Sequence, residues 1–329
     1  MTILGIETSC DETAVAICRN STILSSIISS QKVHIEFGGV VPEVASREHE
    51  LLLNSLVEEA LAKASLELVD MNGIAVTQGP GLAGTLLTGV MFAKGLALGL
   101  QIPIVGVNHL EAHIFANFLA DPSLQYPFVC LLVSGGHTQL WTIEAMGKYT
   151  LLGQTRDDAA GEAFDKGARI LGLNYPGGPA IQALAKSGNP RSVNFPKSFL
   201  KPGNFEFSFS GLKTSLLYFM DGNAGDDHVS KADVAASYQQ AIIDVLTYKL
   251  HQAVQSFGAD TAVVAGGVAA NSALRLSLKE HLVGTRIVYP DLEYCTDNAA
   301  MVSYLGELKV AQGYISEVDF DIIPNMKLV

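Results

Sequence analysis

The sequence predicts an α/β protein built from two duplicated halves, and two repeated patterns predict it. A polar turn between short apolar strands occurs at TSCDET (8–13) and again at SGGHT (134–138). A strand that runs into a glycine-rich loop and a helix occurs at GPGLAG (79–84) and again at GGVAAN (266–271). The turns begin 126 residues apart and the loops 187 residues apart, so an insertion of 61 residues is expected in the second half, around 155–215.

In the first half, three short apolar segments joined by tight turns predict an antiparallel start. Leucines at helical spacing follow, and strands then alternate with helices. The expected strands are 3–6, 14–18, 23–29, 73–77 and 104–107, and the expected helices are 44–64, 86–100 and 109–119.

The second half repeats this order with strands expected at 128–133, 139–143 and 261–265, and the acidic stretch 221–228 is expected to be an exposed loop. Two such halves suggest an actin-like ATPase (ASKHA) fold, because each hairpin turn can offer backbone N–H groups to a phosphate in a cleft between the halves. The expected domains are 1–106 with 299–329, and 107–298.

Composition narrows the class of protein. The 329 residues are 48% hydrophobic and only 16% charged, which excludes a disordered chain. The four cysteines lie far apart, so neither a disulfide framework nor a cysteine-only zinc site is expected. The start of the chain is not a secretory signal, and no uninterrupted apolar run reaches ~18 residues, so a cytoplasmic protein without a membrane span is expected. The net charge of −12 argues against bulk nucleic-acid binding.

The segment HLEAH contains His109 and His113, whose spacing puts both imidazoles on one face of a helix. Two such side chains can bind one metal ion, although ordinary polar packing explains the same spacing. The zinc-protease pattern H-E-x-x-H is absent, because Leu110 stands where the catalytic glutamate is required and Glu111 comes one residue later. A third ligand is expected from a distant carboxylate, and Asp297 in CTDNAAM, at the start of an expected helix, is the candidate.

Three glycine-rich turns, SGGH, YPGGP and AGGVAAN, are typical either of simple turns or of several walls of one nucleotide pocket. GPGLAG fits a dinucleotide fingerprint literally, but no acidic residue stands near 104 to bind a ribose, so that interpretation is disfavoured. Asp165 lies on an expected helix, where it either accepts from ribose hydroxyls or pairs with Arg169.

A basic segment, Lys186–Lys213, contains five basic residues and one acidic residue in an otherwise acidic chain. Five phenylalanines are interleaved with these charges. Basic and aromatic residues in alternation suit an RNA-binding surface. A solvated loop with a small core of its own is the alternative.

Ten short blocks in order, which together span Gly5 to about Met301, have the character of family motifs: GIETSCDET, GGVVPEVASREH, GPGLAGTLL, HLEAH, LLVSGGHTQL, DDAAGEAFDKGAR, YPGGP, FSFSGLKT, AGGVAANSALR and CTDNAAM. Together they resemble the bacterial tRNA N6-adenosine threonylcarbamoyltransferase family. That resemblance implies an actin-like fold of two domains. It also implies an acyltransferase that moves a threonylcarbamoyl group from threonylcarbamoyl-AMP to N6 of the adenosine 3′ of the anticodon, in tRNAs reading codons that begin with A (t6A biosynthesis).

By motif position, the resemblance implies that His109, His113 and Asp297 bind one Fe²⁺ or Zn²⁺ ion, and that Asp11 and Glu12 face the reacting centre as tentative catalytic residues. The residues that it implies for the adenylate pocket are Leu132, Val133, Ser134, Gly135, Gly136, Asp165, Gly178 and Asn271. The archaeal and eukaryotic branch has a tyrosine metal ligand where this chain has Leu132, so the bacterial branch is favoured.

The resemblance implies three partners: tRNA, a smaller homologous subunit and a small ATPase. The shortage of positive charge agrees with a need for help in binding RNA. Two alternatives from other classes are an actin-like small-molecule kinase and a non-enzymatic actin-like scaffold. Neither requires a His-His-Asp group.

Overall fold

Two compact units make up the computed structural model, which describes residues 1–223 and 229–328. One unit is Met1–Pro122 with Pro290–Val329, and the other is Ser123–Tyr289. Five residues of the acidic stretch expected as a loop, 224–228, lie outside the described residues.

The first unit follows the order of strands and helices that the sequence predicts. Its strands are β1 (Thr2–Glu7), β2 (Glu12–Arg19), β3 (Thr22–Ser30), β4 (Gly73–Gly79) and β5 (Ile104–Asn108). Its helices are α1 (His34–Phe37), α2 (Pro42–Ala64), α3 (Ala83–Leu100), α4 (His109–Ala120), α10 (Leu292–Cys295) and α11 (Ala299–Ala311), with a 3₁₀ turn at Leu68–Asp70.

The second unit has the same kinds of elements with more helix between them. Its strands are β6 (Phe128–Val133), β7 (Thr138–Ala145), β8 (Lys148–Gln154), β9 (Thr261–Ala265) and β10 (Arg286–Val288). Its helices are α5 (Ala160–Ile170), α6 (Gly177–Ala185), α7 (Ser210–Tyr218), α8 (Lys231–Phe257) and α9 (Ser272–His281), with short turns at Phe219–Asn223 and Gly267–Ala270.

The two sheets have one topology. The first is ordered β3-β2-β1-β4-β5 and the second β8-β7-β6-β9-β10. In each, the first three strands pair antiparallel and the last three pair parallel. The predicted duplication is therefore confirmed. The sequence pattern missed β8, an edge strand with an irregular register, and β10, which has only three residues.

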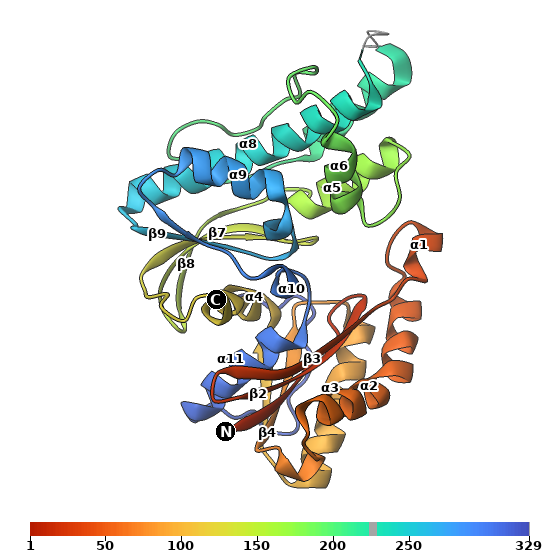
Figure 1. The fold of residues 1–329 in the computed structure, drawn as a ribbon, viewed down its shortest axis with the longest axis vertical. Helices are drawn as coiled ribbons and strands as arrows, with labels where there is room; N and C mark the ends of the chain where they lie inside the picture. The colour runs from red at the N-terminus through yellow and green to blue at the C-terminus, as the bar shows by residue number, and fades with distance from the viewer. Residues whose placement is uncertain (224–228, 329) are drawn as a thin grey trace. The chain divides into compact units, whose positions relative to one another are not determined.

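The first sheet is covered on both faces (Figure 1). Leu4 and Ile6 of β1 belong to the large core that α2 and α3 cover. Small residues face α11 on the other side, including Ala14 and Ala16 of β2. A Cβ added to Gly5 would lie 2.6 Å from the Cβ of Ser303, so only glycine lets α11 lie this close to the sheet.

The chain passes from the first unit to the second between residues 122 and 123 and returns between 289 and 290. The sequence predicts these domain boundaries at 106/107 and 298/299. The difference has a physical reason. Helix α4 packs against α11 and α10, so all three helices belong with the first sheet. In consequence, the two histidines on α4 and Asp297 all lie in one compact unit.

Helix α3 is, among the described residues, long and apolar enough to cross a membrane by length and composition alone. Its mean hydropathy is 1.5, and 33% of its 18 residues are buried. One face of it packs against α2 and β4, and a single helix of this length and composition is weak evidence for a membrane span.

Candidate functional site

Helix α4 begins at the end of β5, and its first two turns present the two histidines. Asn108 caps the helix, because its side-chain oxygen accepts hydrogen bonds from the N–H groups of Leu110 at 2.9 Å and Glu111 at 3.2 Å. This cap sets the helix start at His109, which places His113 one turn further along the same face.

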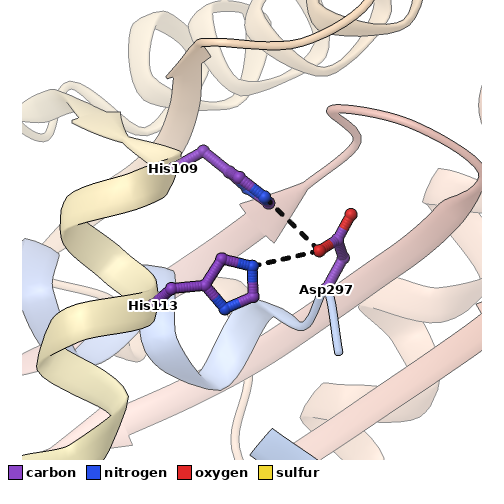
Figure 2. A group of neighbouring side chains, drawn as sticks. All are labelled: His109, His113 and Asp297. Atoms are coloured by element: carbon purple, nitrogen blue, oxygen red, sulfur yellow. Dashed lines mark hydrogen bonds and ion pairs between the residues drawn. The ribbon is translucent and has the colours of Figure 1, made fainter. Parts of the chain in front are cut away.

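The side chains of His109, His113 and Asp297 converge (Figure 2). One carboxylate oxygen of Asp297 lies 3.3 Å from Nε2 of His109 and 3.1 Å from Nε2 of His113. The three possible ligand atoms lie within 4.8 Å of one another. The sequence prediction that these three residues come together is therefore matched by their geometry. Asp297 itself lies just before α11, where Asn298 caps the helix.

The donor set fits a small divalent cation. Ligands held about 2.1 Å from one ion at tetrahedral angles lie roughly 3.4 Å apart, close to the separations between Asp297 and the two imidazoles. Two imidazoles and one carboxylate suit zinc or iron, and three protein ligands leave a coordination position for a substrate or water. The group can therefore hold a metal ion.

Electrostatics in this group favour charge at His109. Burial opposes its protonation, but Glu7 and Asp297 together raise its pKa well above the usual range. Burial lowers the pKa of His113, which also lies beside His109. Burial alone would raise the pKa of Asp297. The two histidines outweigh burial and hold that pKa far below its usual value.

One further residue, which is buried and which sequence reasoning missed, contacts this group. Glu7, at the end of β1, accepts a hydrogen bond on Oε2 from Nδ1 of His109 at 2.9 Å. Its pKa is lowered, because the attraction of His109 outweighs burial. The one signal in the sequence was an acidic residue at the inner end of an otherwise apolar strand, in GIETS.

Asp11 lies on the turn between β1 and β2, and Glu12 is the first residue of β2. Burial, followed by the negative charges of Asp297 and Asp11, raises the pKa of Glu12 to about 9. Glu12 therefore lies within electrostatic reach of Asp297, and a catalytic role for Asp11 and Glu12 stays a prediction. Glu111, by contrast, forms an ion pair of 2.7 Å with Lys309 on α11, which agrees with the absence of a metalloprotease base.

Two of the three glycine-rich turns of the second unit, SGGH and AGGVAAN, lie at one sheet edge. Strands β6 and β9 are parallel neighbours, so the turns that follow them lie at the same edge. Gly266 has a φ of +88°, and a Cβ there would lie 2.4 Å from the carbonyl oxygen of Val133. Gly161, at the start of α5, donates its N–H to the carbonyl of Ser134 at 3.1 Å. The backbone approaches too closely at Gly161 and Gly266 for any residue with a side chain.

The residues expected around the adenylate differ in whether their side chains or only their backbone can reach a ligand. Leu132 and Val133 are fully buried in β6, so only their backbone can serve a ligand. Gly135 and Gly136 are exposed on the turn beyond them. A Cβ added to Gly178 would meet nothing within 4 Å, so open space lies beside that backbone.

Two further residues of this set already have structural partners. Asp165 accepts a hydrogen bond from the N–H of Gly177 at 2.7 Å, which ties α5 to the start of α6. Asn271 caps α9 by accepting from the N–H groups of Ala273 and Leu274, both at 3.0 Å. Its amide also donates to Gln239 at 3.0 Å. A nucleotide role for Asn271 stays a prediction, and helix capping is a role that the structure shows.

The basic segment divides into core and surface. Phe195, Phe207 and Phe209 are buried, so these three rings are not available to stack on bases. Phe199 is exposed at the surface. Lys197 forms an ion pair of 2.5 Å with Asp244 on α8, which offsets part of the local positive charge. The interleaving of aromatic and basic residues is thus largely a packing pattern.

Comparison with known proteins gives one family. The family model described as tRNA N6-adenosine threonylcarbamoyltransferase matches residues 22–304. A protein of that name from Kosmotoga olearia is 49% identical over 332 residues, covering 100% of this chain and 99% of the relative. Another of that name from Desulfitobacterium hafniense is 53% identical, covering 99% of this chain and 97% of the relative.

Solved structures resemble the fold at low sequence identity. HypF of T. kodakarensis aligns with a TM-score of 0.63 at 16% identity, covering 95% of this chain and 48% of that one. Component A of the (R)-2-hydroxyglutaryl-CoA dehydratase of Acidaminococcus fermentans aligns with a TM-score of 0.57 at 15% identity, covering 94% and 99%. These likenesses bear on the fold alone, and the predicted actin-like ATPase fold is confirmed.

Proposed function

The chain belongs to the tRNA N6-adenosine threonylcarbamoyltransferase family, and we propose that it transfers threonylcarbamoyl from threonylcarbamoyl-AMP to N6 of the adenosine 3′ of the anticodon. The tRNAs would be those that read codons beginning with A. The observation that carries this proposal is identity of about half the residues over essentially the whole length of relatives with that name. The chain is accordingly an acyltransferase that acts in tRNA modification.

The proposed reaction sets the task of the protein. The donor is a mixed carbamoyl–phosphate anhydride, whose carbonyl is already activated and whose AMP is a good leaving group. The acceptor is a poor nucleophile, because the exocyclic amine of adenine donates its lone pair into the ring. Positioning the two reactants therefore matters most, and it can contribute roughly 7–11 kcal/mol.

We propose that His109, His113 and Asp297 bind one iron or zinc ion. The convergence of both Nε2 atoms on one carboxylate oxygen supports this ligand set. Bound there, a divalent cation supplies positive charge that polarises a substrate oxygen. Glu12, and less directly Asp11, are proposed to accept the proton that the attacking amine releases. Positive charge beside Asp297 would favour the ionised form of Glu12 that this role requires.

The adenylate is proposed to bind in the second unit, at the turns beyond β6 and β9. The exposed glycines of the Ser-Gly-Gly turn support this, because their backbone N–H groups are free of side-chain cover. The start of α6 also supports it, since open space lies beside Gly178 and a helix N-terminus favours an anion. The side chain of Asp165 is proposed to contribute to the ribose contact.

The partners are proposed to be tRNA, a smaller homologous subunit and a small ATPase, in the cytoplasm. The net charge of −12 supports a need for partners in RNA binding. An exposed apolar stripe on α3, formed by Leu87, Met91 and Leu98, supports a protein partner on the first unit. A kinase or a scaffold of the same fold is not favoured, because neither uses the His-His-Asp group.

Reconstitution tests the reaction. Purified protein, tRNA, ATP, threonine and bicarbonate, together with the partner proteins and the synthase that makes the adenylate, are expected to yield threonylcarbamoyladenosine in tRNA. Nucleoside analysis by mass spectrometry measures it. Full modification in a mixture that lacks only this protein would refute the proposal.

Metal analysis tests the ligand set. His109→Ala, His113→Ala and Asp297→Ala each remove one of three ligands. Each is expected to lower zinc affinity by more than the roughly 10–100-fold typical of removing an outer partner, and to lower activity with it. Competition with a chelator measures the affinity. His251→Ala, on α8 and outside the group, is the control. Full metal occupancy in His109→Ala would sink the assignment.

The nucleotide site is tested by Gly178→Val. A Cβ added at this position meets no protein atom within 4 Å, so the fold should tolerate a larger residue while the space for a ligand is filled. The affinity for ATP is expected to fall about tenfold or more, about 1.4 kcal/mol, with metal content unchanged. Gly211→Val is a matched control, because Gly211 is also the second residue of a helix with open space around it. Equal ATP affinities in both variants, measured by calorimetry, would refute the site.

The basic segment is tested by Lys197→Ala with Lys201→Ala. Lys201 is exposed on a loop that Lys249 fixes by donating to the carbonyls of Phe199 and Asn204. If a lysine pairs with an RNA phosphate, its removal should reduce the slope of log affinity for tRNA against log salt by roughly 0.7–0.9. Because Lys197 is paired with Asp244, most of the change is expected from Lys201.

The control for that experiment is Lys63→Ala with Lys148→Ala, which removes the same charge from exposed positions elsewhere. The assembled complex is titrated with tRNA at several salt concentrations. A slope that changes equally in both double variants would mean that net charge alone, and no phosphate pairing in the segment, is responsible.

A further inference from the structure

Glu7 is a carboxylate that is completely buried at the end of β1. Three donors surround it. Oε1 accepts from the N–H of Ser9 at 2.5 Å, and Oε2 accepts from the hydroxyl of Thr77 at 2.6 Å and from Nδ1 of His109 at 2.9 Å. The Ser9 hydroxyl also lies 3.3 Å from the same Nδ1 atom.

Burial of the Glu7 carboxylate lowers the stability of the folded state unless its partners compensate for the lost water. The other positions of β1 are buried and mostly apolar, and a buried carboxylate costs several kcal/mol unless its partners offset the loss of water. Replacement of such a charged group by a well-packed apolar residue is often neutral or stabilising in proteins. A role beyond packing would explain a charge at this point.

The bond between Glu7 and His109 has a chemical consequence. A neutral imidazole carries one proton, and a carboxylate at Nδ1 keeps that proton on Nδ1. The lone pair is then on Nε2, the nitrogen that faces Asp297. His113 differs, because its buried Nδ1 has no hydrogen-bond partner among the residues that the structure describes. The second ring is held through its other nitrogen, Nε2, which faces Asp297, and through an edge-on contact with the ring of His109.

We propose that Glu7 is a positioning residue for metal binding, which holds His109 in the one tautomer and orientation that can ligate through Nε2. This rests on the proposed metal site. Hydrogen bonds from outer carboxylates commonly fix the ligating histidines of metal sites and raise their basicity. In this chain only one of the two histidines has such a bond. Nδ1 of His109 is hydrogen-bonded to the Glu7 carboxylate, whereas Nδ1 of His113 has no partner in the described residues.

The arrangement requires an acid and not its amide. All three partners of Glu7 present hydrogens when Nδ1 of His109 is protonated. A glutamine would turn its amide N–H₂ group either toward the N–H of Ser9, where two donors oppose each other, or toward His109. In the second case the imidazole proton moves to Nε2, and the nitrogen that should bind the metal is blocked.

The test measures zinc affinity of the full chain by competition with a chelator. Glu7→Gln is expected to lower it roughly 10–100-fold. In a His109→Ala background, Glu7→Gln is expected to cause no further loss, because a residue that acts through His109 has nothing left to hold. Equal losses in both backgrounds would overturn the proposal. Zinc binding is measured without tRNA or adenylate, so the result does not depend on activity.

A matched control separates positioning from loss of a buried acid. Glu307 on α11 is also buried, and it accepts from the N–H groups of Asn20 at 2.7 Å and Ser21 at 2.6 Å. Glu307→Gln is expected to lower the melting temperature while leaving zinc affinity unchanged. An equal loss of zinc affinity in Glu307→Gln and Glu7→Gln would overturn the proposal.

A second variant and a spectrum guard against misfolding of Glu7→Gln. Glu7→Asp keeps the charge and can still accept from the N–H two residues ahead, as aspartates do in turns, but its carboxylate is withdrawn from His109. It is expected to fold and to lose zinc affinity. Proton NMR of the zinc-loaded wild type should show a far-downfield Nδ1–H resonance that His109→Ala lacks.

The same resonance is expected to move upfield in Glu7→Asp. Zinc affinity and an Nδ1–H resonance unchanged in Glu7→Asp would overturn the positioning role while leaving the metal site intact. Normal zinc binding by His109→Ala would instead overturn the metal site, and the role of Glu7 with it. The two failures are therefore distinguishable.

Discussion

A single oxygen atom of Asp297, in contact with two imidazoles, is the constraint on which the first unit depends. The histidines come from α4, which follows β5, and the carboxylate comes from the segment before α11. Both helix starts are fixed by asparagine caps, Asn108 and Asn298, so the ligands stand at defined helix ends. The contact therefore requires α11 to lie close to the sheet.

Small residues make that approach possible. Gly5 faces Ser303, and a Cβ at Gly306 would lie 2.3 Å from the Cβ of Ala75 on β4. Larger side chains at these positions would push α11 outward and carry Asp297 away from the imidazoles. The close packing of α11 on the sheet and the position of Asp297 therefore depend on the same small residues. Gly5 helps to position Asp297 although it does not contact the His-His-Asp group.

Periodicity predicted most strands and the three long helices of the first unit that follow β3, β4 and β5, because apolar residues at spacings of two and 3.6 record which face is buried. It missed β8 and β10, an edge strand and a three-residue strand, and in the second unit it missed the long helix α8. For the site, the spacing of the histidines pointed to one face, and the need for a distant carboxylate made Asp297 at an expected helix start the candidate third ligand, which the family motifs also imply. Glu7 was missed because its role is visible only once His109, 102 residues away, is in place. The phenylalanines of the basic segment suggested exposed rings for RNA binding. Three of them are buried, and their spacing in an irregular segment does not show which face is buried.

The duplicated topology carries opposite chemistry in its two copies. The turn between β1 and β2 is acidic, and with Glu7 and Asp297 it concentrates negative charge, which favours a cation. The corresponding turn between β6 and β7 is Ser-Gly-Gly-His, with two exposed glycines and no acid. Backbone N–H groups there favour an anion. The same hairpin position thus gathers negative charge in one unit and exposes backbone N–H groups in the other, and the difference lies in a few side chains on the same strand order.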